Sequence, residues 1–218
     1  VTGVDNTNLA AINSSLNSAL IDGVKVDTSI EVQTLVDSYN TVLAMADGID
    51  NDASKPSIQD YDNLGISGVD SAHEQVLLGD VLDLKVLADV DSFAELQALA
   101  DAAESVIEAA AGGNPPNLVE LISLGITGVT SDNLPALQQL IDATNDDASE
   151  VQSLADLQAL ATNNATSVNN ALLVLQTAAQ NDTATSTTPA LSVYEAAGVV
   201  GVDNANLAAI NTALNNVT

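Results

Sequence analysis

Five aspartates in two loops are the residues of this chain best suited to metal chemistry. They are Asp47, Asp50 and Asp52 in the first loop, and Asp146 and Asp147 in the second. Calcium prefers such oxygen ligands, but the first loop lacks the EF-hand spacing and its final glutamate. The second loop lies where the following helix needs capping and acidic first-turn residues. We therefore expect caps or solvated loops and no metal or other cofactor, with calcium binding at these aspartates as the alternative.

The single histidine, His73, is the other candidate for chemistry. A catalytic base needs a nucleophile and an orienting acid beside it. The positions that match His73 elsewhere in the chain hold Asn8, Asn133 and Asn206, which indicates an exposed polar residue in a first helical turn. Nucleophile-elbow, phosphate-loop, dinucleotide and zinc-protease motifs are absent from the sequence. We therefore expect no catalytic residue, and a protein that is not an enzyme.

The charge balance excludes nucleic acid as the main partner. The chain of 218 residues has 30 Asp and Glu against 3 Lys and Arg, a net charge of −27, and no cysteine. Binding to a phosphate backbone needs cations that replace counterions, and the three lysines are scattered at 25, 55 and 85. The sequence has no run of about 20 apolar residues, so we expect no membrane insertion. The N-terminus lacks the basic segment of a signal peptide, and we expect a fragment of a longer protein.

The elements that must position these residues recur along the chain. Residues 1–16 and 199–214 are nearly identical, and the same Gly-Val pattern returns twice between them. Each later pair follows a proline by twelve residues, and a Val-Gln or Leu-Gln segment follows each of the first three pairs by 28 or 29 residues. The signature residues of this repeat are Gly3, Gly68, Gly128 and Gly201, with Pro56, Pro116 and Pro189.

Apolar spacing predicts three helices in each unit. A post-glycine helix follows each Gly-Val pair, and its expected N-cap residue is Asp5, Asp70, Thr130 or Asp203. In the first unit the apolar residues of this helix are Leu9, Ile12, Leu16 and Leu20, at helical spacing. A long helix follows, which ends near Gly48 in the first unit and Gly112 in the second, and extends through Leu172 and Leu175 in the third. A short helix then begins with the proline at or near its first position and ends at Gly65, Gly125 or Gly198. Tyr61, Leu121 and Tyr194 share one position of the short helix, which indicates core packing.

This pattern predicts an all-α fold of tandem three-helix repeats arranged end to end in an elongated array. The expected boundaries are a partial first repeat at 1–55, a second at 56–115, a third with a longer helix and a linker at 116–188, and the start of a fourth at 189–218. The sequence leaves open whether the units stack as a continuous solenoid or as separate beads.

The repeat pattern resembles the tandem helical repeats of very large, type I-secreted RTX adhesins on Gram-negative bacteria. The matching stretches are Pro189–Asn211, parts of Pro116–Leu137 and Pro56–Val76, and Val1–Asn13. The resemblance implies an extracellular spacer between a membrane anchor and a distal ligand-binding region. The calcium-binding nonapeptides of that family are absent here.

We therefore expect a non-catalytic structural spacer of a bacterial cell-surface or secreted adhesin. Its partners would be neighbouring repeats of the same polypeptide, with an unidentified surface ligand as a further candidate. The main alternative is a helical binding module that engages a host protein or glycan, for which the sequence supplies no aromatic patch. An acidic intracellular protein adapted to high salt is a third reading, and the low charged content of 15% weakens it.

Overall fold

The computed structural model describes residues 1–49, 54–180 and 188–216, and within them the chain is all-α, as the sequence predicts. Its only β pairing in this part of the chain is an isolated bridge between Asp47 and Val86. The helices are α1 (Leu9–Leu16), α2 (Ser29–Met45), α3 (Ile58–Asn63), α4 (Ala72–Asp83), α5 (Phe93–Ala110), α6 (Leu118–Ser123), α7 (Leu134–Asp142), α8 (Leu154–Gln180), α9 (Leu191–Ala196) and α10 (Leu207–Leu214), with a 3-10 turn at Leu87–Asp89.

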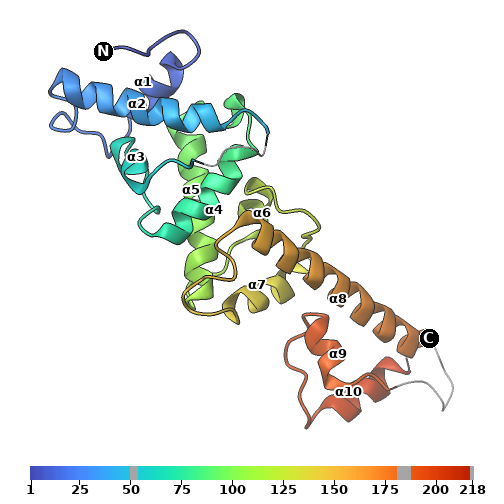
Figure 1. Cartoon of the computed structure of the whole chain (residues 1–218). Coiled ribbons are helices and arrows are strands. Elements are labelled where there is room, and N and C mark those ends of the chain that lie inside the picture. Colours follow the sequence, from blue (N-terminus) through green and yellow to red (C-terminus); the bar gives the residue numbers. More distant parts are fainter. Residues whose placement is uncertain (50–53, 181–187, 217–218) are drawn as a thin grey trace.

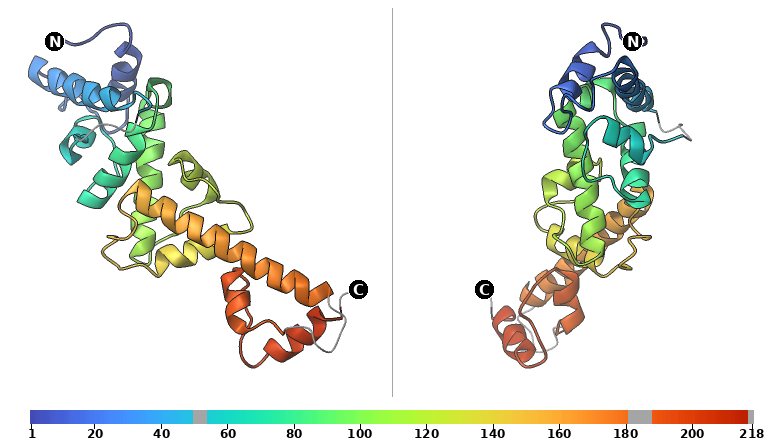
Figure 2. Two further views of the ribbon diagram at one scale, coloured as in Figure 1. Left: turned by 45° about the vertical axis from the view of Figure 1, so that its right-hand side comes forward. Right: turned by 90° about the vertical axis from the view of Figure 1, so that its left-hand side faces the viewer.

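The molecule is elongated, with α1 and α2 at one end and α9 and α10 at the other (Figures 1 and 2). The long helix α8 extends from the middle of the molecule to the end that holds α9 and α10 (Figure 1). None of the helices that the structure describes is both long and apolar enough to cross a membrane.

The long helices α2, α5 and α8 form because each has a strong start and an uninterrupted helical pattern. Thr28 and Glu31 form a reciprocal capping box at the start of α2, and the Ser92 side chain caps α5. Gly112 follows the end of α5 in a left-handed conformation, as expected. The third long helix extends beyond Leu175 to Gln180, which confirms the expected extra length.

The prolines lie slightly outside the short helices α3, α6 and α9, whereas we expected them at or near the first helical position. Pro56 and Pro116 each precede a capping residue, Ser57 or Asn117, so the helix begins two residues after the proline. The polar caps start the helix because their side chains accept from backbone N–H groups of the first turn. The expected glycine ends are confirmed: at Gly65 (φ 76°) the chain turns so that Ile66 N–H donates to the Tyr61 carbonyl at 2.9 Å.

The post-glycine helices α1, α4, α7 and α10 begin later than predicted. Asn8, Asn133 and Asn206 are the N-cap residues of α1, α7 and α10, three positions after the expected Asp5, Thr130 and Asp203. The N-cap of α4 is Ser71 rather than Asp70, with Glu74 completing a capping box. The first helix also ends at Leu16, so Leu20 falls outside it and is exposed.

A continuous hydrophobic core runs from α1 into the first third of α8. It extends along the chain from Ala11 to Ala161, and nearly every member is aliphatic. Tyr61 and Leu121, at the shared position of the short helices, are both fully buried, and Tyr194 is buried around α8 and α9, outside that core. This burial confirms core packing at that position.

Candidate functional site

A glutamine on each long helix holds the backbone beside a Gly-Val pair. Gln33, Gln97 and Gln158 are each the fifth residue of their helix. Each side-chain amide accepts a hydrogen bond from the N–H and donates one to the C=O of the residue before the glycine. The distances from the backbone N to the glutamine Oε1 and from the glutamine Nε2 to the backbone O are 2.7 and 3.0 Å at Thr2, 3.0 and 3.0 Å at Ser67, and 2.8 and 3.1 Å at Thr127. We call this paired contact the glutamine clasp.

An asparagine closes the same loop from the other side in three of the four copies. The side chains of Asn8, Asn133 and Asn206 donate to the carbonyls of Gly3, Gly128 and Gly201 at 2.6 to 2.8 Å. Their Oδ1 atoms accept from the backbone N–H of Asp5, Thr130 and Asp203 at 2.8 to 2.9 Å. These asparagines are therefore structural braces, and Asn8 and Asn133 are buried rather than exposed.

His73 occupies the asparagine position of the second copy but does not brace the loop. Its Nδ1 lies 2.7 Å from Oε1 of Gln152, in the segment before α8, and the side chain is half-buried. The expectation of an exposed polar residue is therefore wrong for His73 as well. The capping box of Ser71 and Glu74 organises this helix start instead, so the histidine is free to contact a later segment.

A third recurring contact fixes each proline carbonyl. Side-chain amides of Gln75, Gln138 and Asn211 donate to the carbonyls of Pro56, Pro116 and Pro189 at 2.9, 2.9 and 3.0 Å. These donors lie on α4, α7 and α10, so the contact ties each short helix to the post-glycine helix that follows it. The prolines thus act through their carbonyl groups as well as through their rings.

The first residue after the glycine that ends each short helix is the apolar plug. Ile66 is 6% exposed and Ile126 is 3% exposed, whereas the matching Val199 is 42% exposed. The glutamine clasp, the asparagine brace, the proline contact and this plug together form what we call the joint. The sequence identified the glycines and prolines of the joint but not its amide side chains, although the glutamines lay within the repeated Val-Gln and Leu-Gln segments.

The three lysines reinforce contacts between neighbouring segments. Lys25 pairs with Asp62 at the end of α3, at 3.7 Å, and Lys55 pairs with Asp80 on α4. The Lys85 side chain donates to the Ser123 carbonyl at the end of α6, at 2.6 Å. A cation near a helix C-terminus is favourable because the last carbonyls carry partial negative charge.

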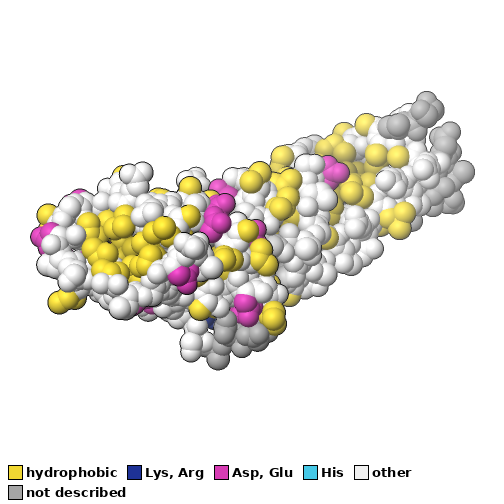
Figure 3. All heavy atoms as spheres, turned by 90° about the horizontal axis from the view of Figure 1, so that it is seen from above, with side chains coloured by type: hydrophobic (Ala, Val, Ile, Leu, Met, Phe, Trp, Pro, Cys, Tyr) yellow, Lys and Arg dark blue, Asp and Glu magenta, His cyan; other side chains and the backbone are white. Residues whose placement is uncertain are grey.

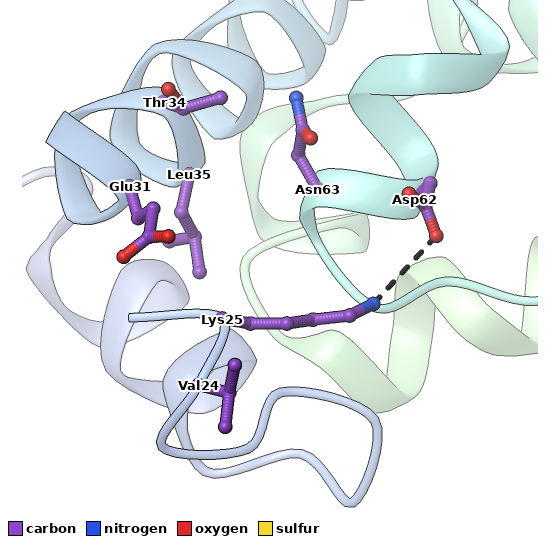
Figure 4. Close-up of a pocket in the computed structure, with 7 residues that line it drawn as sticks. All are labelled: Val24, Lys25, Glu31, Thr34, Leu35, Asp62 and Asn63. Carbon is purple, nitrogen blue, oxygen red and sulfur yellow. Dashed lines mark ion pairs between the residues drawn. The ribbon is translucent and has the colours of Figure 1, made fainter. Parts of the chain in front are cut away.

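An open hollow surrounds the exposed Lys25–Asp62 pair (Figure 4). Val24, Thr34, Leu35 and Asn63 line it together with Glu31, whose carboxylate is occupied by hydrogen bonds from Thr28. These bonds lower the pKa of Glu31. The hollow is lined by one exposed ion pair together with both polar and apolar side chains, which is typical of a solvated surface depression.

The predicted calcium candidates do not form a shared cluster in the part of the chain that the structure describes, where no three His, Cys, Asp or Glu side chains are grouped to hold a metal. Asp47 accepts from Ile49 N–H at 2.8 Å, and Asp147 accepts from Ser149 N–H at 3.0 Å. The Ser149 hydrogen bonds lower the pKa of Asp147. Asp146 adjoins Asp147 in the same loop, and Asp50 and Asp52 lie outside the described residues.

Carboxylates also gather around the joint of the second copy. A Cβ atom at Gly68 would lie 2.4 Å from Oε2 of Glu104 on α5, so the glutamate covers this glycine. Partial burial raises the pKa of Glu104, and the nearby carboxylates of Glu108, Asp101, Asp70 and Glu74 raise it further. Such mutual repulsion opposes folding at neutral pH.

Comparisons with known proteins give no match: no protein-family model fits the chain, and no curated protein and no solved structure is significantly similar to it.

Proposed function

We propose that this chain is a non-catalytic structural spacer built from tandem three-helix repeats that follow one another end to end. The observation that carries the proposal is the joint: the glutamine clasp recurs three times with the same atoms and the same place on each long helix. A catalytic or ligand-binding protein needs one special site, whereas a spacer needs the same joint many times.

The pattern of helix contacts supports a continuous stack over separate beads. The long helix α5 contacts α4 of its own repeat and also α6 and α7 of the next one. In the same way α2 contacts α1, α3 and α4, and α8 contacts α7, α9 and α10. Each long helix is therefore shared by two successive repeats, as in solenoid proteins, where each repeat buries the face of its neighbour.

The surface chemistry also favours a spacer. The net charge of −27 makes distant parts of the chain repel one another, which opposes collapse and self-aggregation. The resemblance described above suggests a place in a bacterial surface adhesin, outside the cell. Immunofluorescence on intact cells, with antibodies raised against this segment, tests that location: staining without permeabilisation is expected, and staining only after permeabilisation would contradict it.

Small-angle scattering tests the spacer role. A compact domain of this length has a radius of gyration of roughly 17 Å. We expect a clearly larger value, and a broader distance distribution in Ile126→Asp, because a carboxylate at this buried plug costs about 2 kcal/mol or more and loosens one joint. Ile122→Asp is the matched control, since Ile122 on α6 is 56% exposed. A native profile near the compact value would refute the proposal.

A further inference from the structure

The first turns of α5 and α8 are each completed by a side chain from the preceding repeat. The N–H of Phe93, the first residue of α5, donates to Oγ of Ser14 on α1 at 2.9 Å. The N–H of Leu154, the first residue of α8, donates to Oδ2 of Asp80 on α4 at 2.9 Å. Backbone N–H groups at a helix start have no acceptor within the helix, so an acceptor from outside stabilises the start.

The segment just before each of these helices is held by the preceding repeat as well. The hydroxyl of Tyr39 on α2 donates to the Val90 carbonyl at 3.1 Å, three residues before α5 begins. Nδ1 of His73, in the first turn of α4, lies 2.7 Å from Oε1 of Gln152, two residues before α8 begins. The histidine, which braces no glycine loop, therefore connects two successive repeats.

The short helices α3 and α6 receive the same kind of support. Ser38 on α2 donates to the carboxylate of Asp60 at 2.9 Å, and Ser105 on α5 donates to the carboxylate of Glu120 at 3.3 Å. Asp60 and Glu120 are the carboxylates of the capping boxes that start α3 and α6. Each of these long helices thus braces the start of the short helix in the next repeat.

These contacts have one direction along the chain. Among the hydrogen bonds between described residues, side chains of an earlier repeat support helix starts of the next one, and no side chain of a later repeat caps a helix start of an earlier one. The caps of α2 and α4 come from their own repeats, Thr28 with Glu31 and Ser71 with Glu74. Since the first turn is the costly step in forming a helix, the earlier repeat lowers this cost for the later one.

We propose that the repeats open in a fixed order, in which a later repeat unfolds while the earlier ones stay folded, and an earlier repeat unfolds only together with the later ones. When the third repeat unfolds, α5 keeps its contact with Ser14. When the second repeat unfolds, α8 loses its contacts with Asp80 and His73. The inference rests on the repeats of the proposed spacer, but neither on its extended shape nor on its location.

Charge repulsion alone would favour the opposite order. The second repeat, 56–115, has twelve Asp and Glu, and the third repeat, 116–188, has eight. Figure 3 shows the same trend on one face of the molecule, where acidic side chains are more frequent towards the end that holds α1 and α2 than towards the other end. Self-repulsion is therefore greater in the second repeat and would open it before the third. The directional contacts and the charges thus predict different orders.

Native-state hydrogen exchange of the whole chain tests the order, because it measures the opening that exposes each amide. In the proposed order, a contact between the second and third repeats is lost in every opening, whereas a contact between the first and second is lost only when the second opens. Asp80→Ala should therefore lower protection about tenfold in α8 and at least as much in α5. Ser14→Ala should lower protection about fivefold in α5 and leave α8 unchanged.

Two further variants repeat the comparison at other contacts between the same repeats. His73→Ala should lower protection in α8 and in α5 by the same factor, whereas Tyr39→Phe should lower it in α5 and leave α8 unchanged. Asp142→Ala, at the exposed last residue of α7, is the control and should change neither helix. Circular dichroism shows whether each variant keeps its helices.

Three results would overturn the proposal. A loss of protection in α8 from Ser14→Ala that equals the loss in α5 would show that the third repeat does not open by itself. Losses from Asp80→Ala and His73→Ala that are confined to α8 would show that the second repeat opens independently of the third. Unchanged protection of α8 in both of these variants would show that the contacts do not stabilise its start. All three results leave an elongated spacer intact, whereas a compact scattering profile refutes the spacer itself.

Discussion

At the scale of single residues, the two equivalent tyrosines of the short helices differ in one hydrogen bond. The hydroxyl of Tyr194 donates to Asn211 at 2.6 Å, while the buried hydroxyl of Tyr61 has no hydrogen-bond partner among the described residues. Burial raises the pKa of Tyr61, whose hydroxyl therefore stays protonated over the whole range in which the protein is handled. A buried polar group without a partner opposes folding.

We expect Tyr61→Phe to stabilise the chain by about 1 kcal/mol, because it removes this unpaired hydroxyl and keeps the ring. Tyr194→Phe should instead destabilise it by a similar amount, because Asn211 loses a donor. Denaturant unfolding of the two variants measures both changes. Equal destabilisation by both substitutions would show that the Tyr61 hydroxyl has a partner, such as a water molecule.

The second residue-scale prediction concerns Glu104, whose pKa is raised by burial and by neighbouring carboxylates. The folded chain holds this proton more tightly than the unfolded chain, so this carboxyl makes the folded state less stable as the pH rises from the unfolded pKa through the folded one. Glu104→Gln should therefore raise the melting temperature at pH 7. The gain should disappear at low pH, where the glutamate is protonated in both states.

Thermal melts from pH 3 to pH 8 check this prediction. Glu95→Gln is a suitable control because that exposed carboxylate accepts from Ser92 at the start of the same helix. It should lose stability at pH 7 instead of gaining it. A gain from Glu104→Gln that is constant over the whole pH range would contradict the electrostatic cause.

At the scale of elements, the glutamine clasp leads to a prediction about how much one side-chain amide stabilises the packing of a long helix against the preceding loop. Gln97→Leu removes both hydrogen bonds to Ser67 and leaves its N–H and C=O to water, which should cost about 1 to 2 kcal/mol. Among the described residues, the exposed Gln59 on α3 bonds only to side chains of its own helix, so Gln59→Leu should change stability by less than about 0.5 kcal/mol. Hydrogen exchange at Ser67 should accelerate in Gln97→Leu alone.

The elements themselves were largely predictable from the sequence. The helix ends at Gly65, Gly125 and Gly198 and the extra length of α8 follow from local residue preferences. The starts of α1, α7 and α10 were not predictable, because Asp5 and Asn8 are both good capping residues three positions apart. Asn8 becomes the N-cap of α1 because its side chain donates to the Gly3 carbonyl, and it reaches that carbonyl only in the folded loop.

The amide contacts of the joint were missed for a related reason. Periodicity identifies apolar faces, and a glutamine within a helix has no distinctive pattern, so the sequence does not single out Gln33 and Gln97. Their partners lie about thirty residues earlier in the chain. Only the packed arrangement of a long helix against the preceding loop places these groups together.

At the scale of the whole molecule, the acidic loops predict a weak response to calcium. Millimolar calcium should raise the melting temperature only slightly, and sodium chloride at matched ionic strength should do nearly the same, because screening of carboxylate repulsion is the shared cause. A large calcium-specific stabilisation that is lost in Asp146→Asn with Asp147→Asn would instead reveal a metal site in the second loop.

The glutamine clasp joins neutral amides to neutral backbone groups, with no formal charge on either partner. Amides do not titrate in the physiological range, and counterions do not screen such a contact as they screen an ion pair. The carboxylates around the joints respond to acidity and salinity, but the clasp keeps the same strength across those changes. An array connected in this way would keep the same spacing between its repeats when the acidity or salinity of the surroundings changes, so its length would not depend on either.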